Sequence, residues 1–210
     1  MQTLSPPKLP LSWVEIPDEL RVAATLEEYW NLVDEVDYQI EYADGEIFSF
    51  MGEASIPHEA LVIALGVQFS AYFNAINDCI VLGSNVKIQP PDSNKSFNAD
   101  VSVVRGKPEM REVVVGRQRR KGLSNLEIVV EIFSDSTRKF DQTTKLEAYK
   151  TIPSLRHVLF VEQHAVSARV VSRPQEPGEW VVRNLSSADD FVQLDDFQFK
   201  LGDVYRQVSF

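Results

Sequence analysis

The chain has 210 residues, of which 44% are hydrophobic and 25% are charged, and this composition is typical of one globular domain with a sizeable core. The formal charge of −10 argues against loose, sequence-independent binding to nucleic acid, because such binding requires Lys and Arg to neutralise phosphates. The single cysteine, Cys79, excludes an intrachain disulfide, and the three histidines lack the spacing of a zinc site. The start of the chain has no signal-peptide pattern, and no run approaches the ~18 apolar residues of a membrane span, so we expect a cytoplasmic protein with no membrane partner.

The N-terminal part of the chain divides at about residue 24. Residues 1–24 contain four prolines and are expected to form an arm lying on the domain. Residues 25–210 are expected to form a single domain. This domain opens with Thr25, which has the N-cap position of a capping box with Glu28 and therefore predicts a short helix.

A β-hairpin is predicted next, because two alternating runs are joined by Asp44 and Gly45. In its first strand, Glu41 faces away from Ile40 and Tyr42. The spacing alone leaves two interpretations of Glu41 equally open, a solvent-facing strand position or a carboxylate of a site.

A long helix is predicted from Pro57, and its first turn carries His58 and Glu59. A histidine at this place is usually a cap or a surface group, and a role in a site is the alternative. The helix should pack on a sheet through an apolar stripe of Leu61, Ala64, Leu65, Phe69, Tyr72 and Phe73.

Strands are then predicted at Ile80–Leu82 and Asn85–Gln89, and another begins at Asp100. Aspartate is depleted in strands, so the position of Asp100 requires an explanation, of which a cap between turn and strand is the simplest. Between Arg105 and Lys121 there are seven basic residues against two acidic ones. This stretch fits a phosphate-facing patch or, more simply, solvated loop charge.

The stretch from Leu126 to Phe133 is almost wholly apolar, as in a central strand that is covered on both faces. Glu131 is the exception. A buried carboxylate must be neutralised, hydrogen-bonded or bound to a cation, because an unpaired ion there costs roughly several kcal/mol. A helix from about Lys139 to Thr151 follows and carries Lys145, so the acid and the lysine are expected to lie close together.

The rest of the chain predicts further strands at Arg156–Val161, Ser167–Ser172 and Glu179–Asn184, and a short helix near Val204–Gln207. Hairpins, one long helix and a mixed sheet together predict a single α/β or α+β domain.

Asp100 and Glu131 would stand side by side if their strands are neighbours. Two carboxylates, a backbone carbonyl and water suit Mg²⁺ or Mn²⁺, whose other ligands are commonly substrate phosphates. Such an ion stabilises charge on a phosphate and lowers the pKa of a bound water, which Lys145 could hold. The simpler explanation of the lysine is a surface ion pair with Asp141, four residues earlier, worth roughly 0.3 to 0.5 kcal/mol.

Four segments occur in a characteristic order, namely IEYADGEI, SIPHEA, NADVSVV and IVVEIFSDSTRKFDQTTKLEAYKTIPSLRHVLFV. In this order they resemble the Uma-type restriction endonucleases, a family first catalogued as a domain of unknown function and placed in the PD-(D/E)XK nuclease superfamily. The resemblance extends in order from about Thr25 to Val161, with a tail to Phe210, and so covers most of the chain. Its motifs are specific together and not singly.

The resemblance implies a restriction-endonuclease-like fold, with a mixed β-sheet flanked by helices and acids on adjacent strands. It implies that Asp100 and Glu131 are metal ligands, and the carbonyl of Ile132 would complete the set. Glu41 matches the glutamate of the family's hairpin motif and would be a further ligand or orient the attacking water. His58 matches the histidine at the helix start, with an open role.

Two positions depart from the family pattern. The proline that usually precedes the motif aspartate is Ala99 here, a change that should affect backbone stiffness more than chemistry. The superfamily lysine belongs two residues after the strand acid, and this chain has Phe133 there. The Uma-type pattern instead offers Lys145 on the following helix, with Lys139 in reserve, and we hypothesise that this lysine reaches the same point.

These features predict a Mg²⁺-dependent endonuclease, with Mn²⁺ able to substitute, that hydrolyses phosphodiester bonds of DNA. Its predicted catalytic residues are Glu41, Asp100, Glu131 and Lys145. A homodimer is expected, because cutting both strands of a duplex usually needs two sites. One alternative is a catalytically inactive nuclease-like domain that binds nucleic acid or protein, which the net acidity and Phe133 favour. Another is a structural protein whose acids are merely paired or hydrated.

Overall fold

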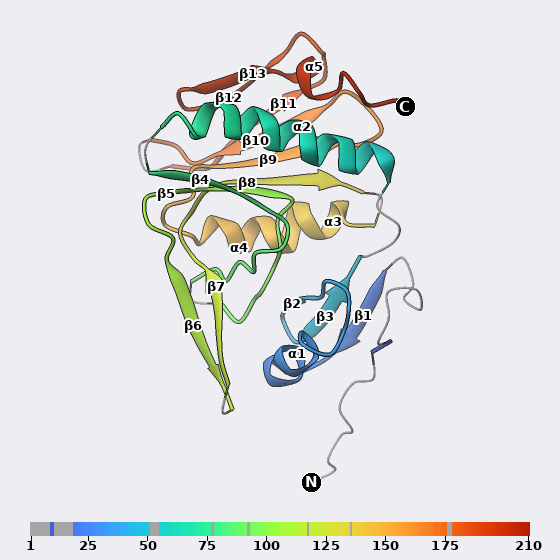
Figure 1. The fold of residues 1–210 in the computed structure, drawn as a ribbon, viewed down its shortest axis with the longest axis vertical. Coiled ribbons are helices and arrows are strands. Elements are labelled where there is room, and N and C mark those ends of the chain that lie inside the picture. Colours follow the sequence, from blue (N-terminus) through green and yellow to red (C-terminus); the bar gives the residue numbers. More distant parts are fainter. Residues whose placement is uncertain are drawn as a thin grey trace.

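A six-stranded mixed sheet carries the central apolar strand, as the sequence predicts (Figure 1). The computed structural model describes residues 9–10, 19–50, 55–76, 78–91, 93–116, 118–134, 136–175 and 178–210. Most of the expected N-terminal arm therefore lies outside the described residues. A smaller three-stranded sheet lies beside the large one.

The large sheet has the strand order β11-β10-β9-β8-β5-β4. Its strands β8 and β9 run parallel, and its other neighbouring pairs run antiparallel. The parallel pair requires a crossover, which the helical segment after β8 provides. The strands are β4 (Cys79–Gly83), β5 (Val101–Arg105), β8 (Leu126–Phe133), β9 (His157–Glu162), β10 (Ala168–Ser172) and β11 (Val181–Leu185).

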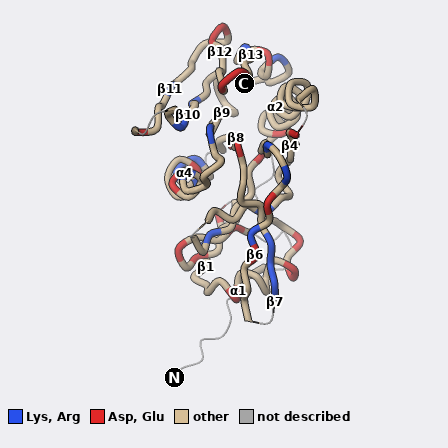
Figure 2. Tube along the Cα trace, turned by 90° about the vertical axis from the view of Figure 1, so that its left-hand side faces the viewer, with Lys and Arg blue, Asp and Glu red and all other residues tan. Residues whose placement is uncertain are grey.

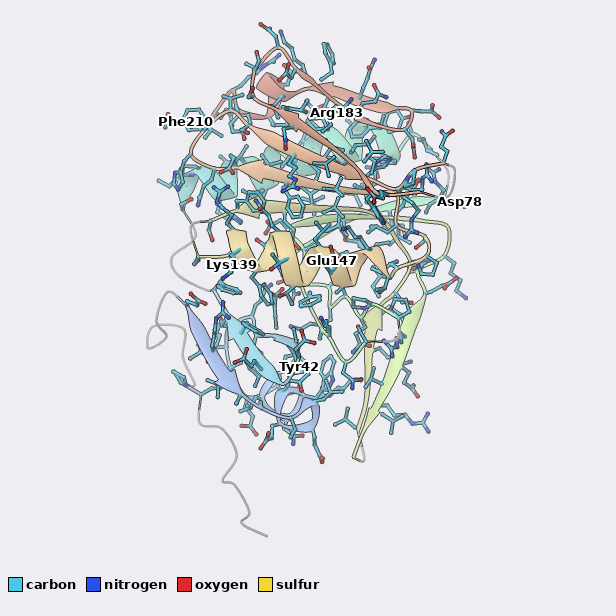
Figure 3. The ribbon with its side chains drawn as sticks, turned by 180° about the vertical axis from the view of Figure 1, so that it is seen from behind. Tyr42, Asp78, Lys139, Glu147, Arg183 and Phe210 are labelled. Carbon is cyan, nitrogen blue, oxygen red and sulfur yellow. The ribbon has the colours of Figure 1, made fainter. Side chains whose placement is uncertain are left out.

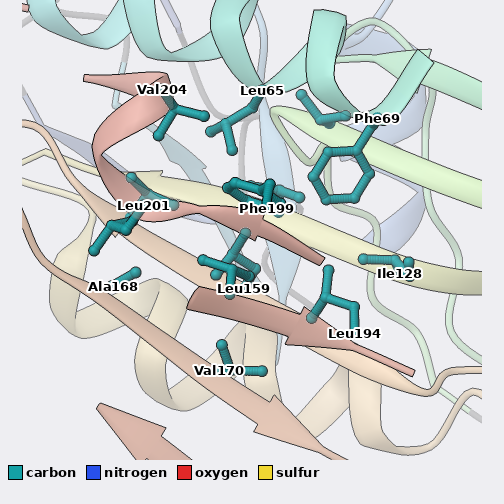
Figure 4. Close-up of a cluster of buried hydrophobic side chains, with 14 of the residues drawn as sticks. Leu65, Phe69, Ile128, Leu159, Ala168, Val170, Leu194, Phe199, Leu201 and Val204 are labelled. Atoms are coloured by element: carbon teal, nitrogen blue, oxygen red, sulfur yellow. The ribbon is translucent and has the colours of Figure 1, made fainter. Parts of the chain in front are cut away.

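One face of this sheet is covered by α2 (Ile56–Phe73) (Figure 1). Ser55 caps the helix by accepting a hydrogen bond from the amide of His58. Helix α2 is also long and apolar enough to cross a membrane by length and composition alone. The expectation that no segment approaches a membrane span is therefore wrong for this helix. In the structure its inner side packs into the core shown in Figure 4, together with β12 (Phe191–Leu194), β13 (Phe197–Lys200) and α5 (Leu201–Val204).

The other face is covered by one helical segment, which the sequence predicts as a single helix from about Lys139 to Thr151. The structure divides it into α3 (Arg138–Phe140), a π-helical turn η2 (Asp141–Lys145) and α4 (Leu146–Lys150). Single π-helical turns inside α-helices often occur at functional sites.

The small sheet has the order β1-β3-β2, formed by β1 (Leu20–Ala23), β2 (Glu41–Ala43) and β3 (Glu46–Ser49). The predicted hairpin is confirmed, with φ of 52° at Asp44 and 88° at Gly45, the positive values that a tight hairpin turn requires. Helix α1 (Leu26–Leu32) begins with the predicted capping box of Thr25 and Glu28.

Two predicted elements differ from the structure. Asn85–Gln89 is not a strand, because its described backbone pairs through isolated bridges at Ile88 alone. The last helix is α5 (Leu201–Val204), so the prediction of Val204–Gln207 was placed too late. Both errors concern short segments, whose bounds and type local sequence patterns specify poorly.

The basic stretch forms a hairpin of β6 (Met110–Val115) and β7 (Gln118–Leu123), whose Lys and Arg positions are visible in Figure 2. Several of its cations have structural partners. Arg111 donates to the carbonyls of Pro90 and Ser93, and three others form ion pairs, so solvated or paired charge explains most of this stretch. The pairs are Arg105 with Glu127, Arg119 with Glu112 and Arg120 with Asp34; Arg117 lies outside the described residues.

Candidate active site

Asp100 directly precedes β5, and Glu131 lies on β8, the neighbour of β5 in the sheet, as expected. Val101 of β5 pairs with Val130 of β8 in antiparallel register, which places Asp100 beside Glu131 at the ends of the two strands. The amide of Ile132 donates to Asp100 Oδ2 at 2.6 Å. Asp100 therefore caps a backbone amide of the neighbouring strand β8, whereas the sequence predicted a cap at the start of its own strand, and its negative charge acts on Glu131.

Lys145 reaches this acidic cluster from the helical segment. Its Nζ donates to the carbonyl oxygen of Asn98 at 3.0 Å, and three carboxylates surround it. The distances are 3.0 Å to Glu41 Oε1, 3.4 Å to Glu131 Oε1 and 3.3 Å to Asp141 Oδ1. The reserve candidate, Lys139, is exposed on the same helical segment (Figure 3).

Asp141 also faces the cluster, because it lies four residues before Lys145 on the same side of the helical segment. Asp141 begins the π-helical turn and Lys145 ends it, and both side chains are buried. The interpretation of these two residues as a surface ion pair is therefore wrong, because only 2% of Asp141 and 5% of Lys145 are exposed.

Glu41 is buried as well, so the solvent-facing alternative for this residue is wrong. Its Oε1 accepts from the amide of Asn98 at 2.7 Å and lies near Lys145. The hairpin of the small sheet thus contributes a carboxylate to the edge of the large sheet.

His58 lies at the open side of the cluster. Its Nε2 is 3.5 Å from Asp100 Oδ1, and its Nδ1 is 3.3 Å from Glu59 Oε1. Burial would lower the pKa of His58, but the hydrogen bond and charge of Asp100, helped by Glu59, outweigh it and raise the pKa. The side chains of His58 and Asp100 are 21% and 18% exposed, whereas that of Glu131 is 4% exposed, so the cluster is open to solvent on the Asp100 side.

A family model described as "Uma2: Putative restriction endonuclease" matches residues 26–203. The chain belongs to this family. Two relatives in Synechocystis sp. are uncharacterized proteins, slr1290 and sll1609. The first is 26% identical over 88% of this chain and 92% of its own length. The second is 24% identical over 66% of this chain and 75% of its own length.

A crystal structure from Anabaena variabilis ATCC 29413, described as that of "a putative nuclease belonging to DUF820", superposes with a TM-score of 0.64. The two chains are 16% identical, and the match covers 86% of this chain and 97% of the other. This similarity concerns the fold alone. Together with the mixed sheet flanked by helices, it confirms the fold class that the sequence predicts, and the Uma2 match confirms the family.

Three members of the cluster escaped the sequence analysis, namely Tyr149, Asn98 and Lys87. Tyr149 Oη donates to Glu131 Oε1 at 2.7 Å. Its position four residues after Lys145, on the same helical face, is a signal that could have indicated it. Asn98 and Lys87 have no comparable signal, because they reach the cluster through backbone and amide contacts between distant segments.

Phe133, at the strand position where the resemblance implies a lysine, has a packing role in the structure. Its ring stacks on Phe160 with centroids 5.0 Å apart, and the guanidinium of Arg138 lies 4.9 Å from its centre. The ammonium near Glu131 therefore comes from the helix and not from this strand.

Burial dominates the electrostatics of the cluster. It raises the pKa of Glu131 well above the ordinary value, although Lys145 acts in the opposite direction. It likewise raises the pKa of Asp141 to about 6. For Lys145, burial alone would lower the pKa, but the charges of Glu131, Glu41 and Asp141 outweigh it and raise the pKa.

The pKa of Asp141 gives a prediction for stability. A folded-state value of about 6, above the ordinary 3.8, means that the folded protein binds more protons than the unfolded chain between these pH values. The stability contributed by protonated Asp141 is present below pH 3.8 and is lost as the pH rises through 6. We expect the wild type to lose roughly 1 to 3 kcal/mol relative to Asp141→Asn between pH 4 and pH 7, measured by urea unfolding.

Glu147→Gln provides the control for this measurement, because Glu147 lies on α4 with 69% of its side chain exposed. It should run parallel to the wild type across the same pH range. Parallel curves for Asp141→Asn and the wild type would contradict the assignment.

The donor chemistry of the cluster fits a magnesium ion. Within the described ranges, no three His, Cys, Asp or Glu side chains form a ready set of metal ligands. Mg²⁺ is nevertheless commonly held by one or two carboxylates plus water and phosphate. Asp100 and Glu131 can supply that pair, while the carbonyl of Ile132 stays a prediction. The cluster contains four carboxylates and two ammonium groups, which leaves two negative charges in excess when all are ionised, and a divalent cation would offset these charges. The carboxylates are those of Glu41, Asp100, Glu131 and Asp141, and the ammonium groups are those of Lys87 and Lys145.

Proposed function

We propose that this Uma2-family protein is a metal-dependent endonuclease that hydrolyses phosphodiester bonds, with DNA as the substrate. The observation that supports this most is the convergence of Asp100, Glu131 and Lys145. Two carboxylates stand on adjacent strand ends, and a buried ammonium lies 3.4 Å from one of them. Membership of a restriction endonuclease family and the fold of a nuclease-like neighbour agree with nuclease chemistry.

In this proposal Asp100 and Glu131 hold Mg²⁺, or Mn²⁺ in its place. When bound, such an ion neutralises charge on the phosphate and lowers the pKa of a coordinated water. Lys145 orients the attacking water or stabilises the negative charge that develops on the phosphate. Glu41 holds the Lys145 ammonium in place through their 3.0 Å contact, and the hydroxyl of Tyr149 fixes one oxygen of Glu131.

Substrate access in this proposal follows from the exposure of the cluster. The exposed edge at Asp100 and His58 is where a phosphodiester would reach the acids, because Glu131, Asp141 and Lys145 are buried behind them. A two-fold homodimer would present two such sites to a duplex.

Cleavage of supercoiled plasmid DNA tests this function. With Mg²⁺ we expect the wild type to nick and linearise the plasmid, and EDTA should abolish the reaction. Asp100→Asn removes one charge from the metal pair and should lower the rate by at least ~100-fold. Asp189→Asn, at a position whose side chain is 85% exposed, should cut at the wild-type rate.

Equal rates for Asp100→Asn and the wild type would contradict the assignment of this carboxylate. Absence of cleavage on double-stranded and single-stranded DNA would overturn the proposed function itself.

A catalytically inactive binding module is the second candidate, and a specific observation favours it. The Lys145 ammonium is already engaged by three carboxylates and one carbonyl, so the cluster is stable as a closed buried network. Metal-independent binding of DNA without cleavage would support this candidate.

A further inference from the structure

Asn98 is the residue through which the separate parts of the cluster are connected. It lies two positions before Asp100 and is 6% exposed. Its amide donates to Glu41 Oε1 at 2.7 Å, and its carbonyl oxygen accepts from Lys145 Nζ at 3.0 Å. The main chain of Asn98 therefore contacts a carboxylate from the small sheet and an ammonium from the helical segment.

The side chain of Asn98 is held as firmly as its main chain. Its Nδ2 donates to the carbonyls of Ser84 at 2.7 Å and Val86 at 3.3 Å. Its Oδ1 accepts from Lys87 Nζ at 2.9 Å. Both ends of the amide are thus satisfied, which fixes its orientation.

Lys87 joins two segments that carry site residues. Besides Asn98, its Nζ donates to the carbonyl oxygen of Ile40 at 2.5 Å, and Ile40 directly precedes Glu41. The ring of Tyr29 lies 5.6 Å from the ammonium. One ammonium therefore bridges the chain immediately before Glu41 and the chain immediately before Asp100.

An ammonium is a costly group for this place unless its charge and donors are used. Burial lowers the pKa of Lys87 to about 8, which shows the cost of desolvation. A methionine would fill a similar volume without that cost. Two hydrogen bonds and the nearby negative charge of Glu41 favour the charged ammonium of Lys87 at this place. These interactions hold the Ile40 and Asn98 segments in position and contribute little to apolar packing.

We propose that Lys87 and Asn98 form a positioning clamp, that is, a pair of residues that holds two parts of the site at a fixed distance. One part is Glu41 with its ion-pair partner Lys145, and the other is the pair of acids Asp100 and Glu131. Neither residue touches the proposed reacting atoms, so both act through the groups that they hold. The catalytic part of this inference rests on the proposed nuclease function.

The clamp has a test that does not depend on cleavage. The amide of Asn98 donates to Glu41, so we expect this bond to protect it from hydrogen exchange, and its exchange rate reports on that contact. In Lys87→Met we expect this exchange to accelerate at least ~10-fold, and in Lys87→Arg to stay nearer the wild-type rate because a cationic donor is kept. Lys95→Met is the matched control, since Lys95 is a partly exposed lysine paired with Asp44 at the same hairpin, and it should leave the exchange unchanged.

Steady-state cleavage of a DNA oligonucleotide with saturating Mg²⁺ tests the catalytic consequence. Misplacement of catalytic groups by about 1 Å can lower a rate by ~100-fold. We therefore expect kcat to fall roughly 10-fold to 100-fold in Lys87→Met and in Asn98→Ala, while KM stays within about threefold of the wild-type value. Lys87→Arg should recover a large part of kcat. Thermal unfolding of each variant, performed in parallel, identifies a loss of folded protein.

The outcomes separate the two proposals. Unchanged Asn98 exchange in Lys87→Met overturns the clamp. Accelerated exchange in Lys87→Met, together with a wild-type kcat in both Lys87→Met and Asn98→Ala, overturns the positioning role of the clamp. If the wild type does not cleave any DNA, accelerated exchange in Lys87→Met still supports the clamp, and the absence of cleavage contradicts the proposed function.

Discussion

Replacing Glu131 by glutamine is expected to lower the single-turnover cleavage rate by ~10³-fold or more, and Lys145→Met should have an effect of similar size. Glutamine keeps the shape of the side chain but removes the charge that would share the cation with Asp100. Methionine keeps most of the length of lysine but removes the ammonium 3.4 Å from Glu131. Losses of ~10² to 10³ are usual when one charge-stabilising group is removed, and removal of a metal ligand adds to this.

Glu147→Gln and Lys150→Met are the matched controls for these two variants. The two residues form an ion pair at 2.7 Å on α4, where the side chain of Glu147 is 69% exposed, so the same chemical changes are made outside the cluster. Both should cut at rates close to the wild type. Cleavage by Glu131→Gln at the control rate would remove Glu131 from the mechanism, and the same result for Lys145→Met would show that the relocated lysine does not replace the missing strand lysine.

Lys145→Met is also expected to destabilise the fold by roughly 3 to 5 kcal/mol at pH 7, because removing one partner leaves buried charges without compensation. Three carboxylates approach this ammonium, and Glu131 and Asp141 have almost no exposed surface. Lys150→Met removes an exposed pair and should change stability by less than about 1 kcal/mol. Urea unfolding with both variants measures the difference.

The destabilisation of Lys145→Met should shrink as the pH falls from 7 to 5. Burial raises the pKa of Glu131 and of Asp141, and loss of the opposing ammonium raises both pKa values further. The folded variant therefore takes up protons that the unfolded chain does not hold, and its stability increases toward acid pH.

The double variant Glu131→Gln/Lys145→Met removes one charge of each sign and should recover part of the lost stability at pH 7. If Lys145→Met is as stable as the wild type at pH 7, Lys145 does not neutralise the cluster, and the assignment of the buried network is incorrect. The same double variant keeps the test informative when the single variant yields little folded protein.

Lys145 lies on a different element from the strand lysine that the resemblance to PD-(D/E)XK nucleases implies. Phe133 occupies the strand position of the superfamily lysine and packs against Phe160 and Arg138. Lys145 approaches Glu131 from the helical segment that packs on this face of the sheet, at the end of a π-helical turn. An ammonium can thus reach the strand acid from a different secondary-structure element, provided that the helix directs its side chain toward the sheet.

Local sequence determined the elements that carry the site. The apolar run around Glu131 identifies a strand covered on both faces, because a strand in that position must bury every side chain. The capping box at Thr25 and the Asp44–Gly45 turn depend on neighbouring residues alone, and both are confirmed. The order of the family motifs was sufficient to predict the fold class and the Uma2 family.

Tertiary structure decided which residues meet around Lys145. Asp141 looked like half of a surface pair, and only the packing of the helical segment against the sheet buries it. Asn98 and Lys87 enter through hydrogen bonds to segments tens of residues away, and such contacts leave no periodic pattern in the sequence. Periodicity reports which face of one element is apolar, whereas the convergence of charges depends on how several elements pack, since desolvation and ion pairing arise only after the chain has folded.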